Sequence, residues 1–82
     1  MKRVSRVTVQ NDYQLQVIFQ DGLKGMVSIK DRLFGPMFEP LKDPDYFAKA
    51  QVDEFGAICW PNGADLAPDA LYRRISDTAN KS

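Results

Sequence analysis

Three pairs of acidic residues are the first candidates for chemistry in this sequence. The pairs are Asp43 with Asp45, Asp53 with Glu54, and Asp65 with Asp69. Two neighbouring carboxylates can serve as general acid and base, or can bind a metal ion. Each pair, however, lies beside a predicted turn or helix start, where a carboxylate accepts hydrogen bonds from backbone N–H groups. We therefore favour a structural role for these carboxylates.

The residues that most often support catalysis are scarce in this chain of 82 residues. It contains no histidine and a single cysteine, Cys59. It therefore lacks the usual general base near neutral pH, the usual zinc ligands and any Ser-His or Cys-His pair. We expect no catalytic residue, no metal site, no cofactor and no small-molecule substrate, and we predict that the protein is not an enzyme.

Three aromatic residues, Trp60, Tyr46 and Tyr72, could form a platform for a ligand. In a domain this small the core is thin, and one large ring can fill its centre. We favour this core role for Trp60.

Five basic residues in or near the predicted strands could contact phosphate groups. They are Lys2, Arg3, Arg6, Lys24 and Lys30. Eleven basic and eleven acidic side chains leave no net charge, so the chain has no general attraction for nucleic acid or anionic lipid. Such cations more often cover the solvated face of a sheet or protect its edge from pairing. Nucleic-acid binding is therefore the weaker alternative.

Four large apolar residues lie in or near predicted loops: Phe34, Met37, Phe38 and Phe55. A small domain has little interior in which to bury large side chains. Buried, these four residues would belong to the core. Clustered at the surface, they would mark a contact area for a protein partner or a second copy of the chain. We take them as the candidate interaction surface.

The N-terminal third of the chain predicts a meander of three antiparallel strands. Residues 3–9 are rich in β-branched side chains, and in residues 13–20 four large apolar residues alternate with three glutamines and Ile18. Between the second and third strands, a three-residue loop with Gly22 in the left-handed conformation keeps the apolar side chains on one face. This register pairs Leu15 with Val27.

In the same register Val17 lies opposite Gly25. We expect Gly25 to leave room for a neighbouring ring or to mark a second bulge.

The middle of the chain is less regular. Residues 30–34 predict one helical turn that Gly35-Pro36 ends, and an irregular connection follows. Asp43 then caps a short helix whose first residue is Pro44.

A second hairpin follows, with residues 49–53 pairing with 57–60 around a loop that ends at Gly56. Its register pairs Val52 with Ile58 and Ala50 with Trp60.

A turn and an amphipathic helix complete the predicted fold. Asn62-Gly63 indicates a tight turn after the strand, and Asp65 is the expected helix N-cap. The helix is predicted over residues 68–75, because Leu71 and Ile75 lie one turn apart.

These elements predict an α+β domain. Its antiparallel sheet has about five short strands, and the C-terminal helix packs on one face. We assign residues 1–75 to a single domain and 76–82 to a disordered tail. With one cysteine, no spanning segment and no signal-peptide pattern, we expect a cytoplasmic protein with no membrane association.

The turn before this helix carries a resemblance. The run Trp60-Pro61-Asn62-Gly63-Ala64-Asp65, with Tyr72 further on, is similar to the motif of a family of small bacterial proteins, domain of unknown function family 2442. The likeness covers residues from about 4 to 75. It implies a compact α+β domain in which the motif residues are a shared structural signature, and it brings no established catalytic residue.

The resemblance also bears on partners, because members of this family are often encoded beside another small protein, as in toxin–antitoxin pairs. Our first hypothesis is therefore a non-catalytic protein-interaction module, in one form the antitoxin-like member of a two-protein system. The expected partner is the neighbouring gene product or a second copy. The alternatives are a nucleic-acid-associated regulator and, last, a small enzyme.

Overall fold

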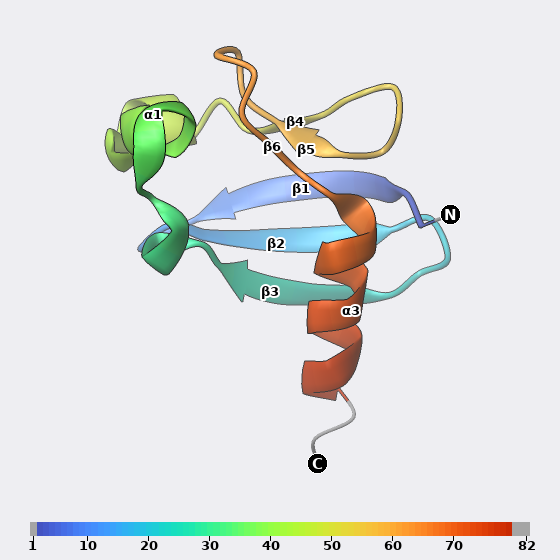
Figure 1. The fold of residues 1–82 in the computed structure, drawn as a ribbon. Helices are drawn as coiled ribbons and strands as arrows, with labels where there is room; N and C mark the ends of the chain where they lie inside the picture. The colour runs from blue at the N-terminus through green and yellow to red at the C-terminus, as the bar shows by residue number, and fades with distance from the viewer. Residues whose placement is uncertain (1, 80–82) are drawn as a thin grey trace.

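The computed structural model describes the backbone of residues 2–79. It shows an α+β fold with two antiparallel sheets of three strands each. The first sheet contains β1 (Val4–Gln10), β2 (Gln14–Phe19) and β3 (Lys24–Ser28), and the second contains β4 (Gln51–Val52), β5 (Ile58–Cys59) and β6 (Asp65–Leu66). The helical elements are η1 (Lys30–Arg32), α1 (Gly35–Phe38), η2 (Glu39–Lys42), α2 (Pro44–Phe47) and α3 (Pro68–Ala79), where η denotes a 3₁₀ helix. Figure 1 shows β4–β6 beside β1, with α3 crossing the first sheet.

The predicted β2–β3 register is confirmed. Leu15 pairs with Val27, and Val17 pairs with Gly25. Leu15, Val17 and Val27 are buried, which explains the register: a slip of β3 by one residue would move Val27 to the solvent face, away from Leu15 and Val17.

Three hairpin loops of the described chain have the same geometry. Each has three residues and ends with a glycine of positive φ: Gly22 at +96°, Gly56 at +80° and Gly63 at +93°. The glycine N–H donates to the residue three positions earlier, in each case at 3.0 or 3.1 Å. Only glycine adopts this conformation without a steric penalty, so glycine placement fixes the three turns.

The single sheet of about five strands is wrong in one respect, since the pairing is divided between two sheets. The predicted second hairpin exists, and Val52 pairs with Ile58. A sixth strand, β6, extends it: Asp65 pairs with Cys59 and Leu66 with Ile58. Asp65 therefore belongs to a strand, and its predicted role as a helix N-cap is wrong.

The connection between the sheets is more helical than predicted. Gly35-Pro36 does not simply end the preceding turn but begins α1, with the proline in the first turn, where its missing N–H costs no helical bond. The segment expected to be irregular forms α1 and η2. The predicted cap of α2 is confirmed, because the Asp43 carboxylate accepts the N–H of Asp45 at 3.1 Å.

Helix α3 packs on the first sheet through a close contact at β3. A Cβ at Gly25 would lie 2.6 Å from Cγ2 of Ile75, so the missing side chain admits the helix. The expected occupant of this space, a ring, is thus an isoleucine. The helix continues to Ala79, so the predicted end at Ile75 and the tail beginning at residue 76 are wrong. Residues 80–82 of that tail lie outside the described residues.

One apolar core joins the two sheets and the helices. Trp60 is 2 % exposed and stacks on Phe47 of α2, with ring centroids 5.9 Å apart. The indole Nε1 donates to the Phe47 carbonyl oxygen at 2.9 Å. Trp60 is therefore a core residue, as expected.

Candidate interaction surface

An apolar hollow of about 440 Å³ lies between α1 and the start of α3. Two of the predicted surface residues, Phe34 and Phe38, form one side of it. Phe34 is 71 % exposed, whereas Phe38 is half-buried against the core. Ala67 and Ala70 lie opposite, on the β6–α3 junction and the first turn of α3. Their small side chains leave the hollow open.

Charged side chains also line this hollow. Arg32 and Asp65 lie among its lining residues, together with Leu66. The hollow therefore combines an apolar floor with one cation and one anion, a composition typical of a protein contact area with a polar rim.

The motif turn between β5 and β6 holds α1 in place. The Asn62 amide donates to the Met37 carbonyl oxygen at 2.8 Å and accepts the Ala64 N–H at 3.1 Å. A Cβ on Gly63 would lie 3.3 Å from the Met37 methyl group. The exposed Met37 side chain therefore rests on this turn, and Asn62 fixes the helix that carries it. Pro61 precedes Asn62 in the loop, and Ala64 is buried.

Phe55 lies elsewhere. It occupies the β4–β5 loop, which Figure 1 shows at the opposite end of the molecule from α1. Phe55 is 66 % exposed. The structure thus brings together Phe34, Met37 and Phe38, which we call the α1 surface, and leaves Phe55 as a separate exposed ring.

One carboxylate of each acidic pair accepts hydrogen bonds from the backbone. Asp43 caps α2, and the Asp53 carboxylate accepts the N–H groups of Phe55 at 2.8 Å and Ala57 at 3.0 Å. Asp69 accepts the Lys2 N–H at 3.2 Å. Within the described residues, no group of three or more Cys, Asp and Glu side chains has the arrangement of a metal site.

Cys59 is half-buried in β5. Burial and the negative charge of Asp53 raise the pKa of its thiol above the ordinary value of 9.0. The thiol is therefore protonated at neutral pH, and a protonated thiol is a poor nucleophile.

Tyr72 and Trp60 contact different residues. Its ring contacts Phe19 edge-on at 4.9 Å, and the Lys2 ammonium lies 4.4 Å from the ring centroid. The Tyr72 hydroxyl donates to the Asp21 carboxylate at 2.6 Å. Tyr72 thus ties α3 to the β2–β3 loop.

This hydrogen bond shifts the pKa values of the two groups in opposite directions. The Tyr72 hydroxyl, with help from the Leu23 N–H, lowers the pKa of Asp21 below its ordinary 3.8. In turn the Asp21 carboxylate raises the pKa of Tyr72 above 10.0. The pair is therefore most stable with Asp21 ionised and Tyr72 protonated.

Replacing Tyr72 with Phe should change how stability depends on pH. A lowered carboxyl pKa contributes stability above the unfolded value near 4 that is lost as pH falls through the folded value. A raised tyrosine pKa contributes stability that is lost as pH rises through its folded value, above 10.0. Urea titrations of both proteins from acid to alkaline pH measure the free energy of unfolding. Wild type should be more stable than Tyr72→Phe at intermediate pH, and this difference should disappear at both extremes. A constant difference across the range would contradict the expectation.

The five basic residues are divided among several contacts. Arg3 donates to the Glu54 carbonyl oxygen, and Lys30 pairs with Asp12 at 3.1 Å. Lys2 lies over the Tyr72 ring. Arg6 and Lys24 are exposed on β1 and β3.

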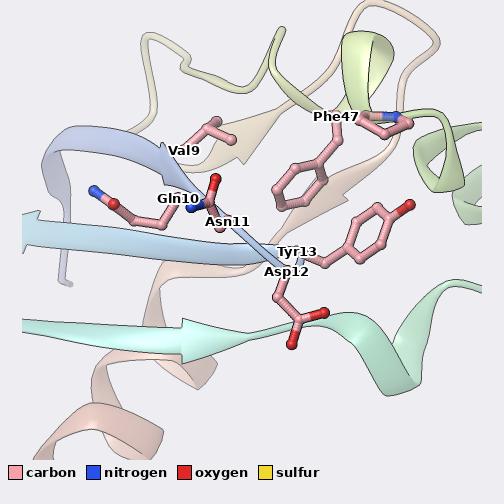
Figure 2. Close-up of a pocket in the computed structure, with 7 residues that line it drawn as sticks. Val9, Gln10, Asn11, Asp12, Tyr13 and Phe47 are labelled. Atoms are coloured by element: carbon pink, nitrogen blue, oxygen red, sulfur yellow. The ribbon is translucent and has the colours of Figure 1, made fainter.

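A second hollow, of about 250 Å³, lies at the β1–β2 turn. Figure 2 shows the rings of Tyr13 and Phe47 close together on one side of it, with the Asp12 carboxylate directed away from Phe47. The rings meet edge-on at 5.3 Å, and the Tyr13 hydroxyl donates to the Lys42 carbonyl oxygen. Val9 also lines the hollow.

The backbone at this turn is strained. Asp12 and Tyr13 have φ values of 60° and 58°, a backbone conformation that residues other than glycine seldom adopt. The Tyr13 contacts with Phe47 and Lys42 offset this strain and join β2 to α2 and η2. These side chains are committed to structure, so we assign no ligand to the hollow.

Part of the lining of the hollow was not predicted from the sequence. Ala67 and Ala70 line the hollow. In a sequence, alanines near the start of a helix are usually explained by the high helix propensity of alanine alone. Their spacing of three residues, which places them on one face of a helix, was the available signal.

Comparison with known proteins identifies one family to which this chain is similar. A family model described as "Protein of unknown function (DUF2442)" matches residues 4–77. Neither the curated proteins nor the solved structures contain a match to this chain. Among residues 2–79, no helix has the length and apolar character needed to cross a membrane.

Proposed function

The chain belongs to the DUF2442 family, whose function is unknown, and we propose that it acts as a non-catalytic protein-interaction module. The observation that carries this proposal is the exposure of Phe34 beside the hollow of the α1 surface. A phenylalanine side chain gains about 1.5–3 kcal/mol on leaving water. Binding a partner would bury Phe34, whereas folding alone leaves it exposed.

Rigid support for this surface favours the same function. Phe38 packs against the core, and Asn62 bonds to the Met37 backbone. Because α1 has only four residues, it depends on these contacts to keep its conformation. A surface held in one conformation loses less entropy when a partner binds.

In its more specific form, the proposal takes the product of a neighbouring gene as the partner and this chain as the antitoxin-like member of the pair. The family resemblance supports this form. We place the pair in the cytoplasm, which agrees with a chain whose one cysteine cannot form an internal disulfide.

The test compares two exposed phenylalanines. Phe34→Asp should weaken the complex with the neighbouring gene product by about 30-fold or more, as expected for a central contact residue. Phe55→Asp, at the other end of the molecule, should leave affinity unchanged. Titration calorimetry measures both, and denaturation curves should show both variants folded, since neither side chain belongs to the core.

Asn62→Ala separates positioning from contact. It removes the bond to Met37 without altering a side chain of the α1 surface, so it should weaken binding less than Phe34→Asp. No complex with the neighbouring product, or equal binding by the Phe34 and Phe55 variants, would refute the proposal. A growth assay with the neighbouring gene tests the antitoxin form, and absence of any growth effect would remove it.

A further inference from the structure

The outer edge of β3 is the second surface that could accept a partner. In the described part of the chain, β3 pairs only with β2. Phe19 N–H donates to Leu23 at 2.8 Å, and Ile29 N–H donates to Tyr13 at 3.0 Å. Hydrogen-bonded pairs recur at every second residue of an antiparallel ladder, so the odd-numbered residues of β3 face β2.

The even-numbered residues Lys24, Met26 and Ser28 therefore direct their backbone groups away from the sheet. A separate contact supports this assignment, because Arg74 donates to the Ser28 carbonyl oxygen at 3.1 Å from outside the ladder. Met26 lies at the centre of the edge and is 49 % exposed. An open edge of this kind is a template for another strand.

Helix α3 provides a roof beside this edge. Its Ile75 packs on Gly25, and the helix continues to Ala79. In Figure 1, α3 crosses β3 and extends past it. A strand added to β3 would lie about 4.8 Å further out. Its side chains on the helix side would lie beside Val27 and beside Ile75, which packs on Gly25, so they would gain apolar contacts as well as hydrogen bonds.

A second copy of the chain fits this edge poorly. A two-fold axis at Met26 would place the two α3 helices about two residues apart along the strands, or about 7 Å, whereas packed helices need about 8–10 Å. Moving the axis to Val27 separates the helices but sets Lys24 opposite Lys30 of the other copy. Like charges directly opposite each other are unfavourable.

We propose that the open edge of β3 accepts an extended segment of a partner protein as a fourth, antiparallel strand of the first sheet. The segment spans about five residues along Lys24 to Ser28, and it displaces Arg74 from the Ser28 carbonyl oxygen. Its residues opposite Gly25 and Val27 point to the helix side and are apolar. Its residues opposite the even positions point to the open face and are polar, with an acidic residue facing Lys24. This site is distinct from the α1 surface and does not rest on it.

The probe is the peptide acetyl-Val-Thr-Val-Thr-Val-Glu-Val-amide, which places Glu opposite Lys24 and the central Thr opposite Met26. Titrated into isotope-labelled protein, it should shift the amide NMR signals of Lys24, Met26 and Ser28 and slow their exchange with solvent. No binding, or shifts that map to another surface, would overturn the proposal.

Met26→Pro removes the one central N–H that the added strand needs. This N–H points away from β2, so the β2–β3 ladder stays intact, and proline is tolerated at such a position. Affinity for the peptide should fall by about tenfold or more, whereas Met26→Thr, which keeps the N–H, should bind as wild type does. Equal binding by the proline variant would refute the strand addition.

Two further measurements keep the test independent of that variant's folding. N-methylation of the central peptide Thr should abolish binding to wild type, and Lys24→Glu should prefer a peptide with Lys in place of Glu. Retained binding by the methylated peptide, or no change of preference, would count against the proposal. Phe34→Asp should bind the peptide normally, which separates this site from the α1 surface.

Sedimentation of the free protein tests whether a second copy of the chain, instead of a partner segment, occupies the edge of β3. We expect a monomer. A dimer that Met26→Pro dissociates would assign the edge to a second copy and overturn the partner segment.

Discussion

Replacing Trp60 with Ala should unfold most of the protein under conditions where wild type is fully native. Truncating a buried Trp costs about 3–5 kcal/mol. The Phe47 carbonyl oxygen, which accepts the indole N–H at 2.9 Å, would also lose its buried partner, at about 1–3 kcal/mol. The sum is comparable with the whole stability of a small domain, which lies low in the range of about 5–15 kcal/mol.

Trp60→Phe is the matched control for this result. It keeps an aromatic ring against Phe47 but removes the N–H donor, so it should destabilise the protein and yet leave it folded. Circular dichroism during urea titration measures both free energies of unfolding. A Trp60→Ala variant that stays native, with a loss below about 2 kcal/mol, would show that the ring is not the centre of the core.

Gly56→Ala should cause the largest loss among the loop glycines. A Cβ at Gly56 would lie 2.7 Å from the Arg3 Cβ and 2.9 Å from the Arg3 Cα, so the backbone just before β1 would have to move. That movement strains the bond from Val4 N–H to the Gly56 carbonyl oxygen, 2.9 Å long. The left-handed conformation costs an alanine about 1–2 kcal/mol, and the clash adds about 1–3 kcal/mol.

Gly22→Ala isolates the conformational part of this cost. Gly22 has a similar φ, +96°, but no heavy atom lies within 4 Å of a Cβ placed there. Its loss should therefore be about 1–2 kcal/mol, measured by the same urea titrations. Equal losses for the two variants would show that the loop at Gly56 moves away from β1 without cost.

The strand pairing of the N-terminal meander could be predicted because it depends on local information. Alternating side chains and a loop glycine allow one register in which Leu15 and Val27 share the buried face. Strand β6 could not be predicted in this way, since two residues show no alternation. Asp65 follows a turn and precedes a helix, so its local sequence fits a cap as well as a strand.

The end of α3 was missed for a related reason. The apolar pattern stops at Ile75, and the polar residues that follow give no periodic signal, although the helix continues to Ala79. The site shows the same limit. Phe34 and Phe38 look alike in the sequence, but tertiary packing buries Phe38 more than Phe34. Phe55 is separated from them because its hairpin projects from the other end of the molecule.

The repeated hairpin design also bears on how fast the chain can fold. In both sheets every pair of bonded strands is adjacent in the sequence, and the connecting loops have three residues or close to it. Hairpins of this size form in about 1–10 μs, and proteins dominated by local contacts cross their main barrier quickly. The slow step is then the meeting of distant segments, where Val4 joins Gly56 and Ile75 settles on Gly25.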